Sequence, residues 1–247
     1  MSFLSLFERT FVLLAVFQFT CFAQTIDPVF EPPGLELGDE YRLIFVTSST
    51  RDATATDIED YNVFVQSVAD AAPAVGSWGL EWKALASTAT VDAVDNTSTD
   101  LSDDPLPIYR IDGEPFARAG VHPFGGSGSP SVFAVEFTEL GTKPPSFEMD
   151  GFRGAAVWTG TGLDGRAGQP FGPLGGGSRG NATLGDSAQG SFAAYANASA
   201  PASLNAHFYA ISEVISVVPE PDISPLSLLF YGSVVLSFWG HRIRAGD

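Results

Sequence analysis

The chain has 247 residues, with 29 acidic and 12 basic side chains and a formal net charge of −17. This excess of carboxylates repels polyphosphate, so nucleic-acid partners are excluded. Hydrophobic residues make up 45 % of the chain, which is enough for a packed core and excludes disorder as its overall description. The single cysteine excludes a disulfide scaffold and any metal site built from several cysteines.

The first 23 residues have the features of a secretory signal peptide. Residues 11–19 are apolar except for Gln18, and Cys21 and Ala23 are the small residues that signal peptidase requires. We therefore expect cleavage between Ala23 and Gln24, so that the exported body begins at Gln24. A buried helix of a cytosolic protein is the alternative, but proline breakers soon after residue 23 end the apolar run.

The body, residues 24–217, is predicted to form one α+β domain, because one helix is followed by many short strands and long loops. Residues 57–71 predict the helix, with Thr56 or Asp57 as its cap and Pro73 ending it. The predicted strands are rich in β-branched or aromatic residues and cover residues 41–47, 82–88, 108–111, 132–137, 155–159 and 208–214.

Two loops of the body carry recognisable turn or charge patterns. Residues 90–107 form a polar, Asp-rich loop, and residues 160–168 form a turn-rich loop in which Asp164 and Arg166 could pair around Gly165. Asp-Gly steps supply the positive φ of tight turns, so turn formation is the simpler interpretation of this second loop. A further Asp-Gly step follows the strand at residues 108–111 and predicts a hairpin.

Four segments occur in an order that resembles the endostatin-like branch of the C-type-lectin-like fold. They are WKALAST at 82–88, PIYRIDGEPF at 107–116, VWTGTGLDGR at 157–166, and the closing strand at 208–214. The resemblance implies a final strand that closes the sheet beside the first. The usual disulfides are absent, so packing of Trp78, Trp82 and Trp158 is expected to replace them. Phe171 stands where the second carboxylate of a calcium–sugar tripeptide belongs, so sugar binding of that type is not implied.

The last 30 residues contain a proline-rich tetrapeptide, an apolar stretch and a basic tip, in that order. The tetrapeptide consists of Val218, Pro219, Glu220 and Pro221. The apolar stretch, residues 223–239, would span roughly 25 Å as a helix at about 1.5 Å per residue. Arg242 and Arg244 follow it, and the positive-inside rule keeps them cytoplasmic while the body lies outside.

This three-part tail, residues 218–247, resembles the PEP-CTERM sorting signal of Gram-negative and related bacteria that make exopolysaccharide. The resemblance implies an exosortase, a membrane cysteine transpeptidase, as partner. That enzyme removes the tail near its prolines and passes the body to the cell surface. A plain single-pass transmembrane anchor is the alternative. Both interpretations place the body outside the cytoplasmic membrane.

The Asp-rich loop is a candidate calcium site, since hard cations prefer oxygen ligands. Its candidate ligands are Asp92, Asp95, Asp100, Asp103 and Asp104. The spacing lacks the central glycine and terminal glutamate of an EF-hand loop, so a solvated acidic loop is the alternative interpretation. No cofactor is therefore expected.

No catalytic residues are expected from the sequence. His122 and His207 are not spaced as a zinc pair, and no Gly-X-Ser-X-Gly elbow is present. Glycosylation triplets begin at Asn96, Asn181 and Asn197, all in predicted loops, and we assign no sugar to them.

The expected protein is thus an exported, non-enzymatic cell-surface component with a structural or interaction role in the envelope or exopolysaccharide matrix. It is held in the membrane by its tail until the tail is processed. Two alternatives belong to other classes: a secreted carbohydrate-active hydrolase, in which two carboxylates converge, and a calcium-dependent glycan-binding module.

Overall fold

The computed structural model describes residues 29–99, 105–124, 132–147, 151–167, 171–176 and 180–219. The strands in these ranges are β1 (Glu40–Val46), β2 (Trp82–Ala84), β3 (Ile108–Arg110), β4 (Pro115–Ala117), β5 (Ala156–Trp158), β6 (Asn181–Asp186), β7 (Ala198–Pro201), β8 (His207–Ser212) and β9 (Ile215–Ser216). The helices are α1 (Glu59–Ala71), α2 (Pro73–Ser77), α3 (Ala93–Asn96) and the 3₁₀-helix η2 (Ser191–Ala194).

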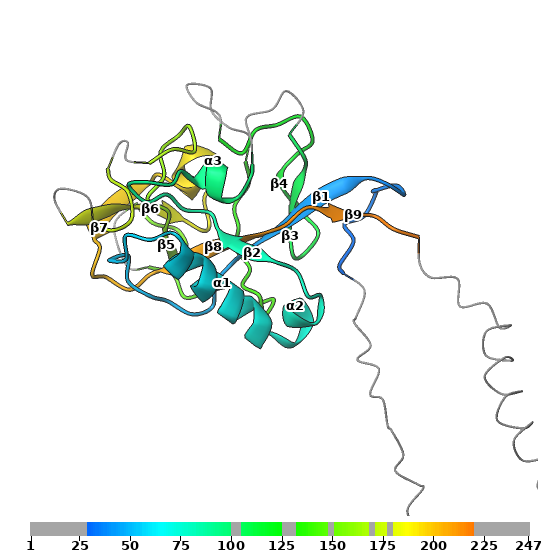
Figure 1. Ribbon diagram of the computed structural model, residues 1–247, viewed down its shortest axis with the longest axis horizontal. Helices are drawn as coiled ribbons and strands as arrows, with labels where there is room; N and C mark the ends of the chain where they lie inside the picture. Colours follow the sequence, from blue (N-terminus) through cyan, green and yellow to red (C-terminus); the bar gives the residue numbers. More distant parts are fainter. Residues whose placement is uncertain are drawn as a thin grey trace, which may run out of the picture.

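The strands form one mixed sheet in the order β4-β3-β1-β8-β5-β6-β7, with β2 paired to β8 and β9 paired to β1 (Figure 1). The β1–β3 and β5–β8 pairs are parallel and the other pairs are antiparallel. A mixed sheet with few helices confirms the α+β class. Strand β8 lies beside β1, with Ile44 opposite Ile211, and the last described strand, β9, also pairs with β1.

Strand β1 is buried on both faces, as its apolar sequence EYRLIFV requires. Because side chains alternate along a strand, Leu43 and Phe45 face one core, whereas Ile44 and Val46 face a second one. Arg42 has the same parity as Ile44, so it occupies the end of the second face.

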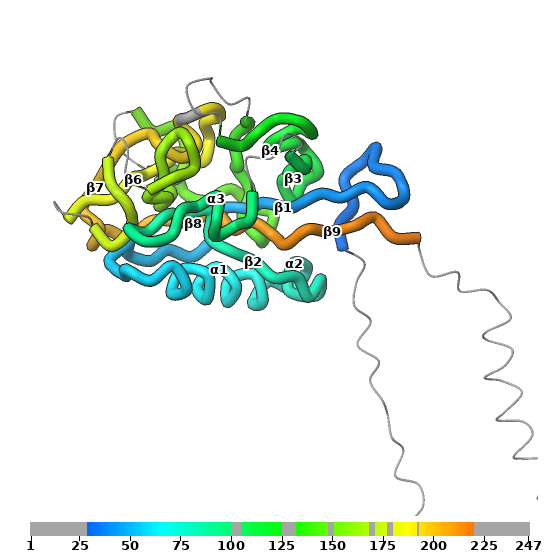
Figure 2. The backbone as a smooth tube through the Cα atoms, turned by 45° about the horizontal axis from the view of Figure 1, so that its top comes forward, coloured from blue at the N-terminus to red at the C-terminus, as the bar shows by residue number. Residues whose placement is uncertain are grey.

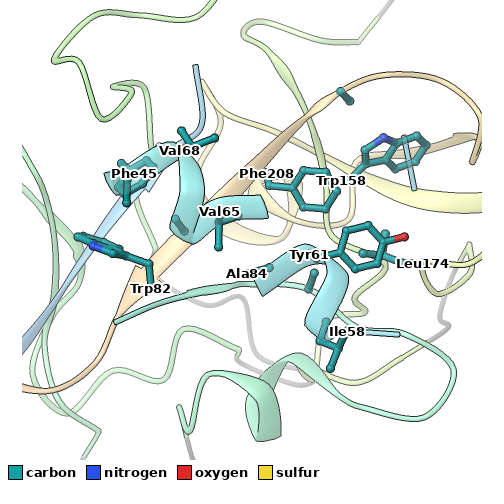
Figure 3. Close-up of a cluster of buried hydrophobic side chains, with 14 of the residues drawn as sticks. Phe45, Ile58, Tyr61, Val65, Val68, Trp82, Ala84, Trp158, Leu174 and Phe208 are labelled. Carbon is teal, nitrogen blue, oxygen red and sulfur yellow. The ribbon is translucent and has the colours of Figure 1, made fainter. Parts of the chain in front are cut away.

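The first core lies between the sheet and α1 (Figure 3). Tyr61 of α1 stacks on Phe208 of β8 with ring centroids 5.2 Å apart, and Phe45 meets Trp82 edge-on at 4.8 Å. Trp82 and Trp158 are buried as expected for a body without disulfides. Each buried side chain of this size contributes about 1.5–3 kcal/mol relative to exposure.

The predicted helix is confirmed, but α1 begins at Glu59 and its N-cap position is Ile58, so the predicted cap at Thr56 or Asp57 is wrong. The Asp57 carboxylate accepts a hydrogen bond from the Glu59 N–H at 3.1 Å. The helix ends at Ala71 because Pro73 starts the separate short helix α2 at a position that suits proline. Figure 2 shows α1 and α2 along one side of the sheet.

The predicted strand at residues 132–137 is wrong. These residues form hydrogen bonds to three separate segments: Phe133 donates to Phe116, Val132 accepts from Ser191, and Phe137 accepts from Val46. Among the described residues no single partner strand runs beside them, so no ladder forms there. The prediction at residues 82–88 is correct only as far as Ala84. After Ala84 a tight turn redirects the chain toward Thr159, which accepts the Ser87 N–H at 2.7 Å.

Six of the described elements were not predicted: α2, α3, η2, β6, β7 and β9. Strand β6 contains Asn, Gly and Asp, which are poor strand formers. Gly185 within it is required because a Cβ there would collide with the Ala194 carbonyl of η2. Strand β7 is paired to β6, and α3 lies inside the segment expected to be loop.

Both ends of the described chain lie at the same end of the body, away from β7 (Figures 1 and 2). Strand β9 pairs with the start of β1, with Glu40 opposite Ser216. The Tyr41 hydroxyl on β1 also donates to the Phe30 carbonyl at 2.9 Å, which ties down the N-terminal segment.

Candidate functional site

The first feature of this end is the point at which the C-terminal segment leaves the sheet. The Val217 N–H donates to the Asp39 carbonyl at 2.8 Å, and the Gly38 N–H donates to the Val217 carbonyl at 2.9 Å. The next residue, Val218, is 70 % exposed. Pro219 has no N–H to continue the pairing. The backbone pairing with β1 therefore ends one residue before the predicted sorting tetrapeptide.

Most of the predicted export and sorting residues lie outside the described residues. This holds for Ala23, Gln24, Glu220, Pro221, Arg242 and Arg244, and for the apolar stretch at 223–239. Among the residues that the structure does describe, no helix combines the length and apolarity needed to cross a membrane.

The second feature is a pocket of about 290 Å³ at the same end of the sheet. Its lining includes Arg42 from β1, Glu81 and Lys83 from the start of β2, and Glu213 and Val214 from the link between β8 and β9. Val214 directly precedes β9. The pocket is thus adjacent to the exit point of the C-terminal segment.

Arg42 is 7 % exposed, and its guanidinium is held by backbone carbonyls. Nη1 donates to the carbonyls of Thr97 at 2.8 Å and Ser212 at 3.0 Å, and Nη2 donates to the Ser98 carbonyl at 3.2 Å. No carboxylate of the described residues lies within 4.0 Å of it. Burial lowers the pKa of Arg42, since leaving water disfavours the charged form.

The two glutamates of the pocket are fixed to each other by one backbone–backbone bond and one bond between a backbone N–H and a carboxylate. The Glu213 N–H donates to the Glu81 carbonyl at 2.8 Å, and the Glu213 carboxylate accepts the Glu81 N–H at 3.0 Å. Lys83 pairs with the Glu81 carboxylate at 3.4 Å. The rim of the pocket therefore holds both signs of charge in a defined arrangement.

The candidate calcium ligands are only partly described. Both oxygens of Asp92 are engaged: the Arg166 guanidinium donates to one at 2.9 Å and the Ala167 N–H to the other at 2.7 Å. Asp95 is exposed on α3. Asp100, Asp103 and Asp104 lie outside the described residues. Within the described ranges no three acidic, His or Cys side chains are grouped as a metal site.

The predicted turn at residues 161–166 is confirmed, but the ion pair between Asp164 and Arg166 is not formed. Gly165 has φ +76°, and Asp164 accepts the Arg166 backbone N–H at 3.1 Å. The Arg166 guanidinium extends to Asp92 instead. The turn thereby fastens its own loop to the start of α3.

Neither of the two histidines in the described part of the chain is arranged for hydrolytic catalysis. His207 Nδ1 lies 2.6 Å from the Thr47 carbonyl, and the adjacent Ser48 donates both its N–H and its hydroxyl to the buried Glu139 carboxylate. A Ser–His–carboxylate relay needs the serine on the imidazole, which is not the pairing here. His122 Nδ1 is buried without a partner among the described residues.

The loop placement predicted for the glycosylation triplets is wrong for two of them. Asn96 is buried in α3 and bonded to Asn62, and Asn181 is the first residue of β6. Asn197 precedes β7 and donates to the Gly151 carbonyl at 3.3 Å.

No family model matches this chain, and no curated protein matches it.

The pocket residues were not predicted from the sequence, although Arg42 carries one signal. Arg42 is a charged residue inside an otherwise apolar strand, and a buried strand tolerates an arginine only where acceptors surround it. The acceptors come from segments more than 50 positions away, so their identity could not be read from the sequence.

Proposed function

We propose that this protein is exported and then attached to, or released at, the cell surface through its C-terminal PEP-CTERM-like tail. Its single α+β body is of the C-type-lectin-like kind and has a non-enzymatic structural or interaction role in the envelope or exopolysaccharide matrix. An exosortase processes the tail, and signal peptidase removes the leader.

One observation carries the proposal. The backbone pairing of the body with β1 ends at Val217, and the sorting tetrapeptide begins at the exposed Val218. A membrane transpeptidase needs an extended, accessible segment, and two prolines keep this segment out of helices and ladders. Cleavage after Val217 would leave every described hydrogen bond between β9 and β1 in place.

Charge and composition also support the proposal. Residues 24–218 carry 25 acidic and nine basic side chains, so the acidity belongs to the body. A strong net charge keeps a surface protein soluble at high local concentration. The core contains the buried Trp82 and Trp158, and β8 lies beside β1. Both features support the resemblance to a lectin-like fold in which packing replaces the usual disulfides.

The test is replacement of Pro219, Glu220 and Pro221 by alanine in the full chain, expressed in its own host. We expect an uncleaved form that stays in the membrane fraction, identified by its intact mass. The matched control replaces Pro144 and Pro145, a proline pair inside the body, and should be processed normally. Normal processing of the tail variant would exclude exosortase sorting and leave a plain anchor.

The hydrolase alternative is tested with the purified protein and the host's exopolysaccharide. The proposal expects no release of reducing ends over time. Release that is lost on heat denaturation of the protein would assign the body to the hydrolases.

A further inference from the structure

The pocket beside β9 retains unused hydrogen-bond donors. A guanidinium has five N–H groups. The carbonyls of Thr97, Ser98 and Ser212 take three of those on Arg42, and the other two have no acceptor among the described residues. Arg42 is 93 % buried and lines the pocket. A ligand that accepts hydrogen bonds from these two N–H groups is therefore stabilised there.

The same pocket offers acceptors. Glu213 uses one carboxylate oxygen for the Glu81 N–H, and its other oxygen has no donor among the described residues. Glu81 is held by Lys83 through a single, partly exposed ion pair. A ligand that both donates and accepts hydrogen bonds is therefore better suited than one that only accepts.

The charges of the lining decide the class of ligand. Arg42 and Lys83 supply two positive charges, and Glu81 and Glu213 supply two negative ones, so the lining is neutral overall. An anion would meet repulsion from both carboxylates, and a cation would meet repulsion from the other pair. Neutral hydroxyl groups pay no such cost. Ile211 and Val214 add apolar surface for C–H groups.

We infer that this pocket binds one neutral sugar ring, with vicinal hydroxyls between Arg42 and Glu213. The volume of about 290 Å³ lies at the lower end for small-ligand sites, which suits a terminal ring rather than the interior of a chain. This inference rests on the proposed matrix role and names its ligand class. It needs no metal ion, because the polar groups of the pocket contact the ring directly.

The test uses the full chain in a detergent without sugar headgroups and with EDTA present. The probes are methyl α-glucoside, methyl α-mannoside and methyl β-galactoside. Their binding is measured by saturation-transfer NMR and by titration. At least one of them should bind. Sodium glucuronate and glycine, an anion and a zwitterion, should bind at least tenfold more weakly.

Two variants locate the site. Glu213→Gln keeps the side-chain size and should weaken the bound glycoside by about tenfold, since an acceptor of charge-assisted bonds is lost. Glu136→Gln removes a carboxylate that is paired with Lys143 and lies outside the pocket lining, and it should leave binding unchanged. Circular dichroism should show that both variants are folded.

Several results would overturn the inference: no transfer from any of the three glycosides, equal binding by Glu213→Gln, tighter binding of glucuronate or glycine, or loss of binding in EDTA. Tail processing of Glu213→Gln should be normal in its own host. A pocket that binds no sugar therefore leaves the sorting proposal intact, and a sorting failure leaves the pocket result intact.

Discussion

The side-chain amides of Asn62 and Asn96 hydrogen-bond to each other in both directions, with both N···O distances at 2.9 Å. Asn62 also accepts the Ala84 N–H at 3.0 Å, and Asn96 donates to the Ala84 carbonyl at 2.7 Å. The pair thus satisfies the backbone of β2 on the edge that faces away from β8, as a neighbouring strand would. It connects α1, α3 and β2 within one buried network.

Asn62→Ala should lower the free energy of unfolding by about 2–4 kcal/mol, because it leaves the buried Ala84 N–H without its acceptor and the buried side-chain oxygen of Asn96 without its donor. Urea unfolding measures this. Asn197→Ala removes one long hydrogen bond from a partly exposed side chain and should change stability by less than about 0.5 kcal/mol. Combining Asn62→Ala with Asn96→Ala should cost less than the sum of the two, since the partners share bonds. Strict additivity would argue against a network.

Gly165→Ala should destabilise the protein by about 2–5 kcal/mol, because alanine is strained at this positive φ and its Cβ overpacks the core. A Cβ at this position would collide with Val94 and lie 2.7 Å from the Phe124 ring. Gly120 is a matched control, because it has φ +71° but nothing within 4 Å of an added Cβ. Gly120→Ala should therefore cost only about 1–2 kcal/mol. Equal melting temperatures for the two variants would refute the collision.

Acidification should weaken the fold through His207. Burial lowers the pKa of this imidazole below its ordinary 6.5, although the Thr47 carbonyl and the Glu139 carboxylate act in the opposite direction. At pH values between the lowered folded pKa and the ordinary pKa of 6.5, the unfolded chain binds more protons than the folded one. The contribution of His207 to the free energy of unfolding is therefore fully present above pH 6.5 and is lost as the pH falls toward the folded pKa.

The measurement is urea unfolding at about pH 7.5 and about pH 5.5, on either side of the ordinary histidine titration. His207→Asn can still donate to Thr47 but does not titrate, so it should lose less stability on acidification than the wild type. The same loss in both proteins would remove His207 as the cause.

Calcium should not stabilise the body through Asp92, because both oxygens of that carboxylate already accept N–H groups. Asp92→Asn should cost about 0.5–1.5 kcal/mol, because the amide oxygen can still accept the Ala167 N–H but the charge-assisted bond from Arg166 is lost. That cost should be the same in millimolar calcium and in EDTA. Asp95→Asn, at an exposed position, serves as control. A calcium-dependent shift in melting temperature that vanishes in Asp92→Asn would restore the calcium site.

The helices and strands that could be predicted are those whose own sequence pattern matches their place in the fold. The apolar sequence of β1, the amphipathic face of α1 and the Asp-Gly hairpin between β3 and β4 each carry their own signal. Strand β6 carries no such signal. Gly185 is chosen there for the close approach of η2, a contact made by residues nine positions further along the chain.

The same distinction holds for the candidate sites: a contiguous sequence pattern could be predicted, and a site assembled by the tertiary fold could not. The tail was predicted as a contiguous pattern, and the structure describes only its first two residues. The Arg42 pocket is assembled from four segments, and only the tertiary fold brings Glu81 and Glu213 to the same arginine. Asp92 was selected for its charge, but its actual partner, Arg166, lies 74 positions away.

The pairing of β1 with β8 and β9 has a consequence for biosynthesis. Ile44 and Ile211 face each other although 167 positions separate them, and β9 extends the same edge. Contacts of such long sequence separation form late and slowly. Until residues 207–216 emerge, one edge of an apolar strand stays open and is prone to aggregation. A nascent chain can therefore complete this fold only after residues 207–216 are available to pair with β1.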